Sequence, residues 1–447
     1  MSSNEVLVVG GGIVGIFSAI YLKKYYNRVV LVERETELGG LLKSKADKNR
    51  INFDYGTHIP CETLISEIDE ILFNNMSQDE WEYLDKLSVG NYFLDSYYAE
   101  SGYPNTLRLL EEEYLKGIID LLNGESTSYE EENLEKYLKK VYGKGYTNSI
   151  YRPLMKKLTG KELDQLHTKA YKIFDISRLI VGDYNLTREL KMSSKIDSKI
   201  AFPQYSENYS KNIKFYPKNN KGIGIWIKDM AEYASKIGIE IFTDCKVTNI
   251  KTQNSKISEL ELSNQEILNP NKIIWTVTPY ELIKLLDIKV ETYKPEFKKL
   301  VLCNIIFNKN FNVENHYLYC FDSKMKSYRI TLYPNLTKTL SEIEIYNCTV
   351  EAFLDKDETI DEEGIIEELC KMGVIDPSFT VISFEKEEIM NGFPIITEQY
   401  VKEMKNQQKA INDNIVDVIL LGKAKGESFF MVDTLTEAYE ELSKLEK

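Results

Sequence analysis

The sequence has no long hydrophobic run. None of its apolar stretches approaches the roughly 18 residues that a transmembrane helix needs, so we expect no transmembrane segment. The first residues, Met1 to Glu5, are too short and too polar to form a secretory signal peptide. We therefore expect neither a membrane span nor a cleaved leader.

Cysteine is sparse, and its spacing does not suggest a disulfide framework. The six cysteines contain no CxxC pair and lie at Cys61, Cys245, Cys303, Cys320, Cys348 and Cys370. We interpret them as free reduced thiols, which predicts a cytoplasmic protein. No cluster of His, Cys and carboxylate residues has the spacing of metal ligands, so no metal site is predicted.

Basic residues are outnumbered, and arginine is scarce. The 56 Lys and Arg residues face 70 Asp and Glu residues, which gives a formal net charge of −14. This balance argues against a protein that coats nucleic acid or a basic membrane surface. Only eight of the basic residues are Arg. Because the guanidinium group is a planar fork that suits phosphate oxygens, each arginine position is informative.

A glycine-rich turn follows the first expected strand. Residues 5–9 (EVLVV) predict a buried parallel strand, and Gly10 to Gly15 (GGGIVG) match the pattern GxGxxG. Residues 13–26 then show helical apolar spacing, and residues 28–33 (RVVLVE) predict a second strand. In this setting Gly10 permits the tight turn, Gly12 lets backbone N–H groups reach a pyrophosphate, and Gly15 allows the helix to pack closely. The unit predicts dinucleotide binding, with a purely structural glycine turn as the alternative.

An acidic residue at the end of the second strand supports this interpretation. A carboxylate that binds a ribose 2′-hydroxyl is expected about 20 residues after the glycines. Glu33 lies close to that position. A carboxylate at this position repels a 2′-phosphate and so disfavours NADP. Gly39 and Gly40 follow shortly afterwards and let the chain double back over the nucleotide.

The rest of the chain alternates in character. Residues 62–200 have a mostly helical pattern, and residues 215–251 read as turn, helix, strand and strand. Residues 271–277 predict another buried strand. A second, antiparallel sheet is expected from five segments: 299–307, 317–321, 327–333, 343–353 and 380–384. The end returns to strand, glycine loop and helix, at 416–421 and 434–445.

Together these motifs resemble the FAD-binding flavoproteins that include amine oxidases, protoporphyrinogen oxidase and UDP-galactopyranose mutase. The glycine turn with Glu33, Arg34 and Gly39-Gly40 carries most of the resemblance. Residues 54–60 (DYGTHIP), 215–227, 273–279 and 422–433 (GKAKGESFFMVD) resemble later segments of these proteins in the same order. The resemblance implies FAD as the cofactor. It places Val247 at the adenine side, and Gly422, Met431 and Val432 near the pyrophosphate and the pyrimidine side of the flavin.

The resemblance also implies an architecture. We expect an α/β fold with a Rossmann-type, glutathione-reductase-like FAD-binding domain, an interleaved helical insertion and a second antiparallel-sheet substrate domain. The expected segments are residues 1–90, 201–290 and 391–447 for the FAD-binding parts, 91–200 for the helical insertion or cap, and 291–390 for the substrate sheet.

Three details resemble the UDP-galactopyranose mutase branch. GTHIP is similar to a segment that places a histidine, here His58, beside the flavin; SYRI is similar to a strand with an arginine, here Arg329, near flavin and substrate phosphate; and the tail GESFFMVDTLTEAYE has a similar ending. The branch implies attack of flavin N5 on a sugar anomeric carbon. Arg152, Arg178, Tyr317 and Tyr333 are the candidate substrate residues, although Gly182 stands where a further phosphate arginine is expected.

The chemistry and substrate stay open at this point. A flavoenzyme of the oxidoreductase superfamily acting on a small polar molecule, most simply a nucleotide sugar, is the first hypothesis. Oxidation of an amine or C–H bond by hydride transfer to FAD is the alternative, and a flavin-binding protein without catalysis is the second. No nucleic-acid partner is expected, and the sequence does not indicate an oligomeric state.

Overall fold

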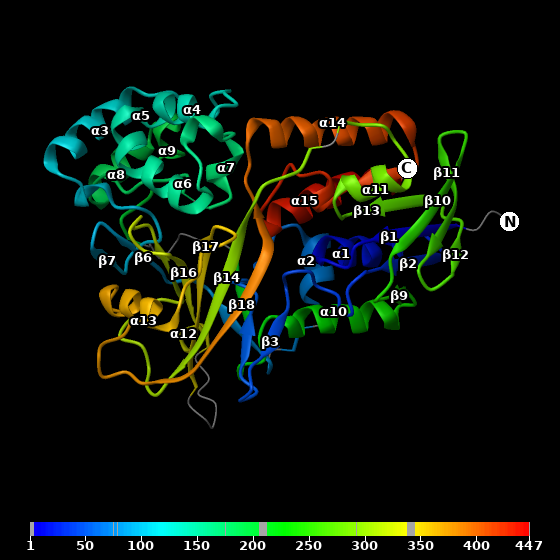
Figure 1. The fold of residues 1–447 in the computed structure, drawn as a ribbon, viewed down its shortest axis with the longest axis horizontal. Helices are drawn as coiled ribbons and strands as arrows, with labels where there is room; N and C mark the ends of the chain where they lie inside the picture. The colour runs from blue at the N-terminus through cyan, green and yellow to red at the C-terminus, as the bar shows by residue number, and fades with distance from the viewer. Residues whose placement is uncertain are drawn as a thin grey trace. The chain divides into compact units, whose positions relative to one another are not determined.

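The computed structural model describes residues 4–74, 76–77, 79–174, 176–204, 212–291, 293–337 and 345–446. The chain forms two compact units, each built from segments that lie far apart in the sequence (Figure 1). Unit 1 contains Met1–Tyr83, Asn212–Tyr293 and Lys402–Lys447, and unit 2 contains Leu84–Lys211 and Lys294–Val401. The finer division into five segments stays a prediction.

A five-stranded parallel sheet forms the centre of unit 1, in the order β19-β13-β1-β2-β9. Val6 of the middle strand pairs with Val29 on one side and with Lys272 on the other. The strands are β1 (Glu5–Val9), β2 (Arg28–Val32), β9 (Glu240–Phe242), β13 (Lys272–Trp275) and β19 (Val418–Leu420). β1 is buried on both faces, which explains its continuous apolar run.

Two different layers cover this sheet. One face packs on the helices α1 (Ile13–Leu22), α2 (Ser66–Phe73), α10 (Gly224–Lys236) and α15 (Met431–Leu442). The other face packs on an antiparallel sheet and two helices: β10 (Val247–Gln253), β11 (Lys256–Leu262), β12 (Ile267–Leu268), α11 (Pro279–Leu285) and α14 (Glu398–Asn414). Val6 and Val8 point into the first core, and Leu7 and Val9 into the second. The expected strand–glycine turn–helix–strand order is confirmed.

Two small strand pairs complete unit 1. β3 (Ser44–Ala46) pairs with β4 (Asn52–Asp54), and β5 (Trp81–Leu84) pairs with β8 (Lys214–Pro217).

A seven-stranded sheet organises unit 2, in the order β18-β14-β17-β16-β15-β6-β7. Its strands are β6 (Val89–Phe93), β7 (Ser96–Tyr98), β14 (Phe297–Phe307), β15 (Tyr317–Cys320), β16 (Ser327–Leu332), β17 (Tyr346–Leu354) and β18 (Val381–Pro394). All neighbours are antiparallel except β15 and β6. One face forms an apolar core with α13 (Glu362–Lys371), and α12 (Tyr333–Leu336) follows β16 directly. The expected second sheet is therefore present; residues 343 and 344 of its expected fourth strand lie outside the described residues.

The helical part of unit 2 consists of short helices between β7 and β8. They are α3 (Glu111–Asn123), α4 (Leu134–Val141), α5 (Gly143–Tyr146), α6 (Arg152–Thr159), α7 (Lys169–Lys172), α8 (Tyr184–Lys191) and α9 (Ser194–Asp197). A buried lysine ties two helix ends together. The ammonium group of Lys199 donates to the carbonyl oxygens of Leu121 (2.7 Å), Glu125 (3.1 Å) and Val141 (3.2 Å).

Three strands lie in the stretch that the sequence pattern indicates to be mostly helical. β5, β6 and β7 fall between residues 81 and 98. All five residues of β6 are buried, because it lies inside the sheet next to β15. It therefore lacks the alternation by which a half-exposed strand is recognised.

All six cysteines lie in the described residues, and each is a free thiol. Among the helices of the described residues, none has the length and apolar character of a membrane span.

Candidate functional site

The glycine turn of unit 1 is closely packed on its inner side. Gly10 has a φ of +103°, a conformation that favours glycine, and its N–H donates to the carbonyl of Val32 at 2.8 Å. A Cβ on Gly15 would lie 1.8 Å from the carbonyl oxygen of Gly10. Thr276 Oγ1 donates to the carbonyl of Val9 at 2.9 Å and holds the turn from β13. The turn can therefore form only with glycine at positions 10 and 15.

The outer side of the same turn is open. Gly12 precedes the first turn of α1, and no side chain caps that helix end. A Cβ built on Gly12 would meet no atom within 4 Å. The first N–H groups of a helix lack intrahelical partners and carry a partial positive charge. This combination of free donors and empty space suits a phosphate group.

The second glycine pair lies beside Gly12. Gly39 has a φ of +110°, its N–H donates to the carbonyl of Gly11 at 2.7 Å, and it pairs with Gly12 in an isolated parallel bridge. A Cβ on Gly40 would lie 3.8 Å from the Cα of Gly12. The two glycine segments thus lie side by side, and neither carries a side chain that would fill the space next to them.

Glu33 lies at the end of β2 and next to the turn. Its buried carboxylate accepts the N–H of Gly11 at 2.6 Å and the N–H of Glu35 at 2.9 Å. The N–H of Cys245 donates to the carbonyl of Glu33 at 2.9 Å, which brings the start of β10, with the buried Val247, to the same edge. Arg34 is exposed and forms ion pairs with Glu35 and Glu281.

The C-terminal segment reaches the same turn. Gly422 has a φ of +57°, and a Cβ on it would lie 3.5 Å from Val14 of α1. Met431 and Val432 begin α15 and are partly buried. The structure therefore brings together most of the cofactor residues that the sequence predicted: Gly10, Gly12, Gly15, Glu33, Gly39, Gly40 and Gly422.

Lys423 is a candidate that the sequence analysis missed. Its pKa is lowered, first by desolvation of the ammonium group and then by the charge of Arg34, while Glu33 opposes the shift. Lys423 is exposed and directly follows Gly422, which lies beside Val14 of α1. In the sequence, Gly422 was expected to lie near the pyrophosphate. A cation directly after it was the signal that could have identified Lys423.

His58 and Asp54 belong to the DYGTHIP segment, and they differ in their surroundings. A ring nitrogen of the partly buried His58 lies 3.3 Å from the carbonyl oxygen of Tyr55. Asp54 is buried, and its carboxylate accepts from Ser44 Oγ (2.6 Å), Tyr216 Oη (2.6 Å) and the N–H of Ile223 (2.8 Å). Burial raises the pKa of Asp54 to about 6, against these three hydrogen bonds, which lower it. Through these hydrogen bonds Asp54 links β3, β8 and the residue just before α10.

Arg329 lies on the polar face of the sheet in unit 2. Its Nε and Nη2 donate to the two oxygens of Glu351, at 2.7 and 2.9 Å. The side chain of Glu351 is 2% exposed and that of Arg329 23%. Burial alone would lower the pKa of Arg329, but the charge of Glu351 and of nearby tyrosines raises it overall. Arg329 is thus a permanent cation whose charge Glu351 already balances.

Two candidate tyrosines lie near this pair. Tyr317 pairs with Thr331, and its ring contacts Tyr319 at 5.6 Å between centroids. Tyr333 Oη and Thr349 Oγ1 are hydrogen-bonded at 2.8 Å, and Thr349 pairs with Thr331 across the strands. Unit 2 therefore brings Arg329, Tyr317 and Tyr333 to one sheet.

The other two arginine candidates lie in the helical part and hold local structure. Arg152 is bound to Glu135 and forms a longer ion pair with Glu162, at 3.6 Å. Arg178 Nη1 donates to the carbonyls of Asp197 (2.5 Å) and Ile200 (2.9 Å). The sequence could not indicate these partners, because they are backbone groups or carboxylates distant along the chain. Both assignments to substrate stay predictions.

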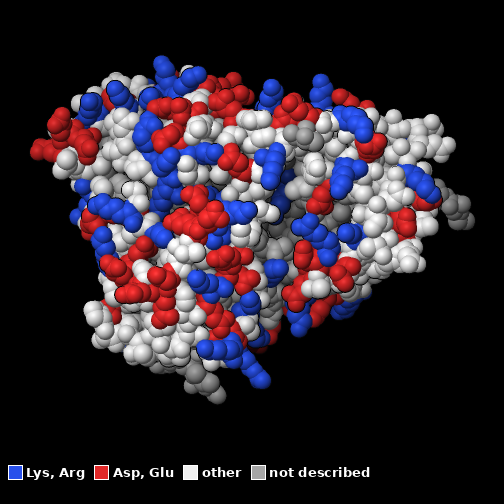
Figure 2. Space-filling model, viewed as in Figure 1, with Lys and Arg blue, Asp and Glu red and all other residues white. Residues whose placement is uncertain are grey.

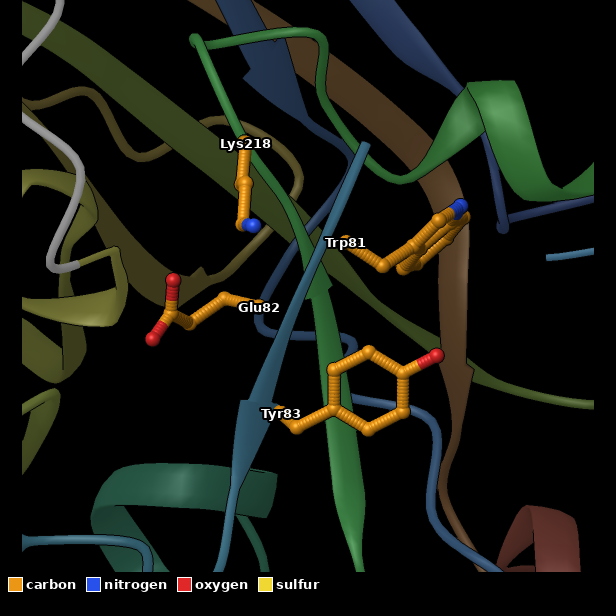
Figure 3. A pocket seen from close by; sticks show the side chains of 4 residues that line it. All are labelled: Trp81, Glu82, Tyr83 and Lys218. Carbon is orange, nitrogen blue, oxygen red and sulfur yellow. The ribbon is translucent and has the colours of Figure 1, made fainter. Parts of the chain in front are cut away.

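A surface hollow lies at β5 of unit 1, lined by Trp81, Glu82, Tyr83 and Lys218. Figure 3 shows Trp81 and Tyr83 on one side of the strand and Glu82 with Lys218 on the other. None of the predicted site residues lines it. Within the described residues, no group of three or more His, Cys, Asp or Glu side chains could hold a metal ion.

Comparison with known proteins agrees with the geometry. Residues 8–64 match the family of NAD(P)-binding Rossmann-like domains. No curated protein sequence matches the chain. Among solved structures, that of reduced UDP-galactopyranose mutase is 15% identical, with a TM-score of 0.76, and the match covers 99% of this chain and 95% of the mutase. The chain has the fold of UDP-galactopyranose mutase.

Other enzymes share this mutase-like fold. A protein from Exiguobacterium sp. 255-15 assigned as a protoporphyrinogen oxidase is 14% identical, with a TM-score of 0.68 and coverage of 100% of this chain and 99% of that one. A CLA-producing fatty acid isomerase from P. acnes is 12% identical, with a TM-score of 0.59 and coverage of 99% and 98%. The fold class predicted from the motifs is confirmed. Because the fold serves different chemistries, it does not by itself define the substrate.

The buried carboxyl group of Asp54 predicts a specific pH dependence. Its pKa is about 6 in the folded chain and 3.8 in an unfolded one. The folded state therefore binds more protons between these values, and stability must fall as the pH rises through this window. The loss amounts to about 3 kcal/mol. Asp54→Asn removes the titration but keeps an oxygen that can accept the N–H of Ile223.

Urea unfolding at pH 4 and at pH 7 tests this prediction. Between pH 4 and pH 7, the free energy of unfolding of the original protein should fall by about 3 kcal/mol more than that of the Asp54→Asn variant. Asp417→Asn, at another buried carboxylate of unit 1, serves as the comparison. Equal pH dependence in the original protein and the Asp54 variant would contradict the assignment.

Proposed function

We propose that the protein is an FAD-dependent enzyme of the amine oxidase superfamily. The observation that carries the proposal is the open glycine cradle at the N-terminus of α1, in a chain with the fold of a flavin-type mutase. Further support comes from Glu33, Gly39-Gly40 and Gly422, which surround the same cradle.

The residues of unit 1 fit an FAD dinucleotide. The N–H groups at the start of α1 and the empty space at Gly12 accommodate the pyrophosphate. Glu33 keeps further lone pairs that can accept the hydroxyl groups of a ribose. Lys423 adds positive charge on this side, and Val247, Met431 and Val432 are the proposed backbone contacts. Bound FAD would supply hydride-accepting or nucleophilic chemistry at its flavin ring.

The substrate that we propose is a small polar molecule, with a nucleotide sugar as the first candidate. In this proposal His58 lies beside the flavin, and Arg329 together with Tyr317 and Tyr333 binds the substrate. Arg329 contributes positive charge and N–H donors in a fixed planar geometry. The tyrosines contribute apolar ring faces with a hydroxyl group at the tip.

The arginine contacts favour a second candidate function. Arg329 is paired with Glu351, Arg152 with Glu135, and Arg178 with two backbone carbonyls. A diphosphate normally takes charge-assisted bonds from forked guanidinium groups, and each of these three groups already directs some of its N–H donors to a protein partner. Oxidation of an amine or C–H bond in a substrate without a diphosphate is therefore the alternative.

The flavin proposal predicts a visible spectrum that depends on Gly12. The protein as purified should be yellow, or should take up FAD. Gly12→Leu should lose FAD retention at least about 100-fold, because its side chain occupies the space for the pyrophosphate, while thermal unfolding of the cofactor-free chain should change little.

Gly15→Ala is the matched comparison for this variant. Its Cβ would clash with Gly10, so this change should destabilise the chain itself. A colourless protein without affinity for FAD, or full retention by Gly12→Leu, would contradict the proposal.

The two chemistries predict opposite responses of the flavin. Anaerobic addition of an oxidisable amine or alcohol should bleach the oxidised flavin if the protein is an oxidase. Turnover of a nucleotide sugar only with chemically reduced flavin, with no net loss of electrons, would identify mutase chemistry. A flavin spectrum unaffected by a panel of both substrate classes would instead favour the non-catalytic binding protein.

Paired variants at Arg329 and Glu351 separate a substrate role from a structural one. Arg329→Met removes the cation that pairs with the buried carboxylate of Glu351 and should cost about 3–5 kcal/mol of stability, much of which Arg329→Met/Glu351→Met should restore. If Arg329 also binds substrate, KM of the double variant should stay at least about tenfold raised. Restoration of both stability and KM would limit Arg329 to a structural role.

A further inference from the structure

The start of β16 contains a β-bulge. Ser327 pairs with Ala352 of β17, and Arg329 pairs with the adjacent residue of that strand, Glu351. Two steps along β16 therefore correspond to one step along β17, and Tyr328 is the extra residue. Because the side chains of a regular strand alternate between the two faces of a sheet, one extra residue changes the face on which every later side chain lies.

The bulge places Arg329 on the polar face. Ser327 lies on the side of the sheet that α13 covers, since its partner Ala352 belongs to that core and its hydroxyl group donates to Glu368 of the helix. With regular alternation, Arg329 would lie two positions later on this same apolar side. It lies instead on the other side, where its guanidinium group binds Glu351.

The extra residue lies on the polar face as well. Tyr328 is buried, and its hydroxyl group donates to the carbonyl of Phe174 at 2.8 Å. Its ring contacts those of Tyr319 and Phe353, at 5.5 and 5.3 Å between centroids. Tyr319 is the cross-strand partner of Arg329. Two consecutive side chains of β16 thus share one face, which only a bulge allows.

Two charged side chains hold Ser327, which is fully buried. The carboxylate of Glu368 accepts the N–H of Ser327 at 2.9 Å and that of Lys326 at 2.7 Å. The ammonium group of Lys157, on α6, donates to three backbone carbonyls: those of Ser327 (2.7 Å), Cys320 (2.9 Å) and Asp322 (2.9 Å). An ammonium group has three N–H donors, so these bonds use all of them. Ser327 is therefore held at both its N–H and its carbonyl group.

We propose that Lys157 and Glu368 are positioning residues for Arg329: by fixing Ser327 they maintain the bulge, and the bulge keeps the guanidinium group on the polar face. This inference rests on the proposed function, in which Arg329 binds the substrate. Loss of either side chain lets the start of β16 move toward regular pairing with β17, so that Arg329 leaves its place beside Glu351.

The Nε–H group of Arg329 reports its position in an NMR spectrum. The chain has only eight arginines, so the full-length protein labelled with ¹⁵N-arginine, with any cofactor that it retains, gives at most eight Nε–H signals. Arg329→Lys identifies the signal of Arg329 by its loss. In the original protein this proton should exchange slowly with water, because Nε donates to the buried carboxylate of Glu351 at 2.7 Å.

Lys157→Met and Glu368→Gln should each shift this signal and speed the exchange of its proton at least about tenfold, because a hydrogen bond to a charged group weakens. Lys156→Met and Glu367→Gln are the matched controls, since these neighbours are exposed. They should leave the signal unchanged. Basic and acidic side chains are interspersed over the face seen in Figure 2, so the loss of one exposed charge alters the surrounding field little.

An unchanged Arg329 signal in Lys157→Met and Glu368→Gln, or an equal change in the two controls, would overturn the proposal. Parallel changes in the signals of Arg152 and Arg178 would overturn it too, because they indicate a general loss of stability in unit 2. Glu368→Gln keeps the shape of the side chain and one acceptor oxygen, so it decides the question if Lys157→Met does not fold. The measurement needs neither bound flavin nor substrate, which separates its failure from failure of the proposed function.

Discussion

The arrangement of unit 1 depends on the close approach of α1 to the end of β1. A side chain at Gly15 would overlap the carbonyl of Gly10, so the helix reaches its place only because that side chain is absent. Once α1 lies there, its N-terminus points at the space beside Gly12, and Glu33, Gly39 and Gly422 gather around that space. The tight inner packing and the open outer side are thus two consequences of one turn.

Unit 2 follows a different principle. One face of its sheet packs on α13, and the other carries polar side chains that bind one another, such as Arg329 with Glu351 and Tyr333 with Thr349. Pairing offsets part of the cost of burying these groups. It also makes the Arg329–Glu351 pair neutral overall. For this reason the proposed substrate extends beyond diphosphate compounds to small polar molecules without that charge.

Much of the nucleotide-binding part could be predicted because its signals are local. The apolar run at β1, the glycines and Glu33 lie within thirty residues, and each has a steric or electrostatic meaning that is independent of the rest of the chain. Partners in unit 2 could not be read in the same way. Arg178 binds backbone carbonyls and Arg329 binds a glutamate 22 positions away, and neither pairing has a sequence signature. β6 was missed because a fully buried strand shows no alternation.

The strand order of unit 1 has a consequence for biosynthesis. β1 (Glu5–Val9) is flanked by β2, which follows soon after it, and by β13 (Lys272–Trp275), which begins 272 − 9 = 263 residues after β1 ends. Until that stretch emerges, one apolar edge of the nascent sheet has no partner. Contacts so distant along the chain slow folding and leave unpaired edges open to association. The protein should therefore depend on chaperones during translation more than a chain of equal length built from successive, self-contained domains.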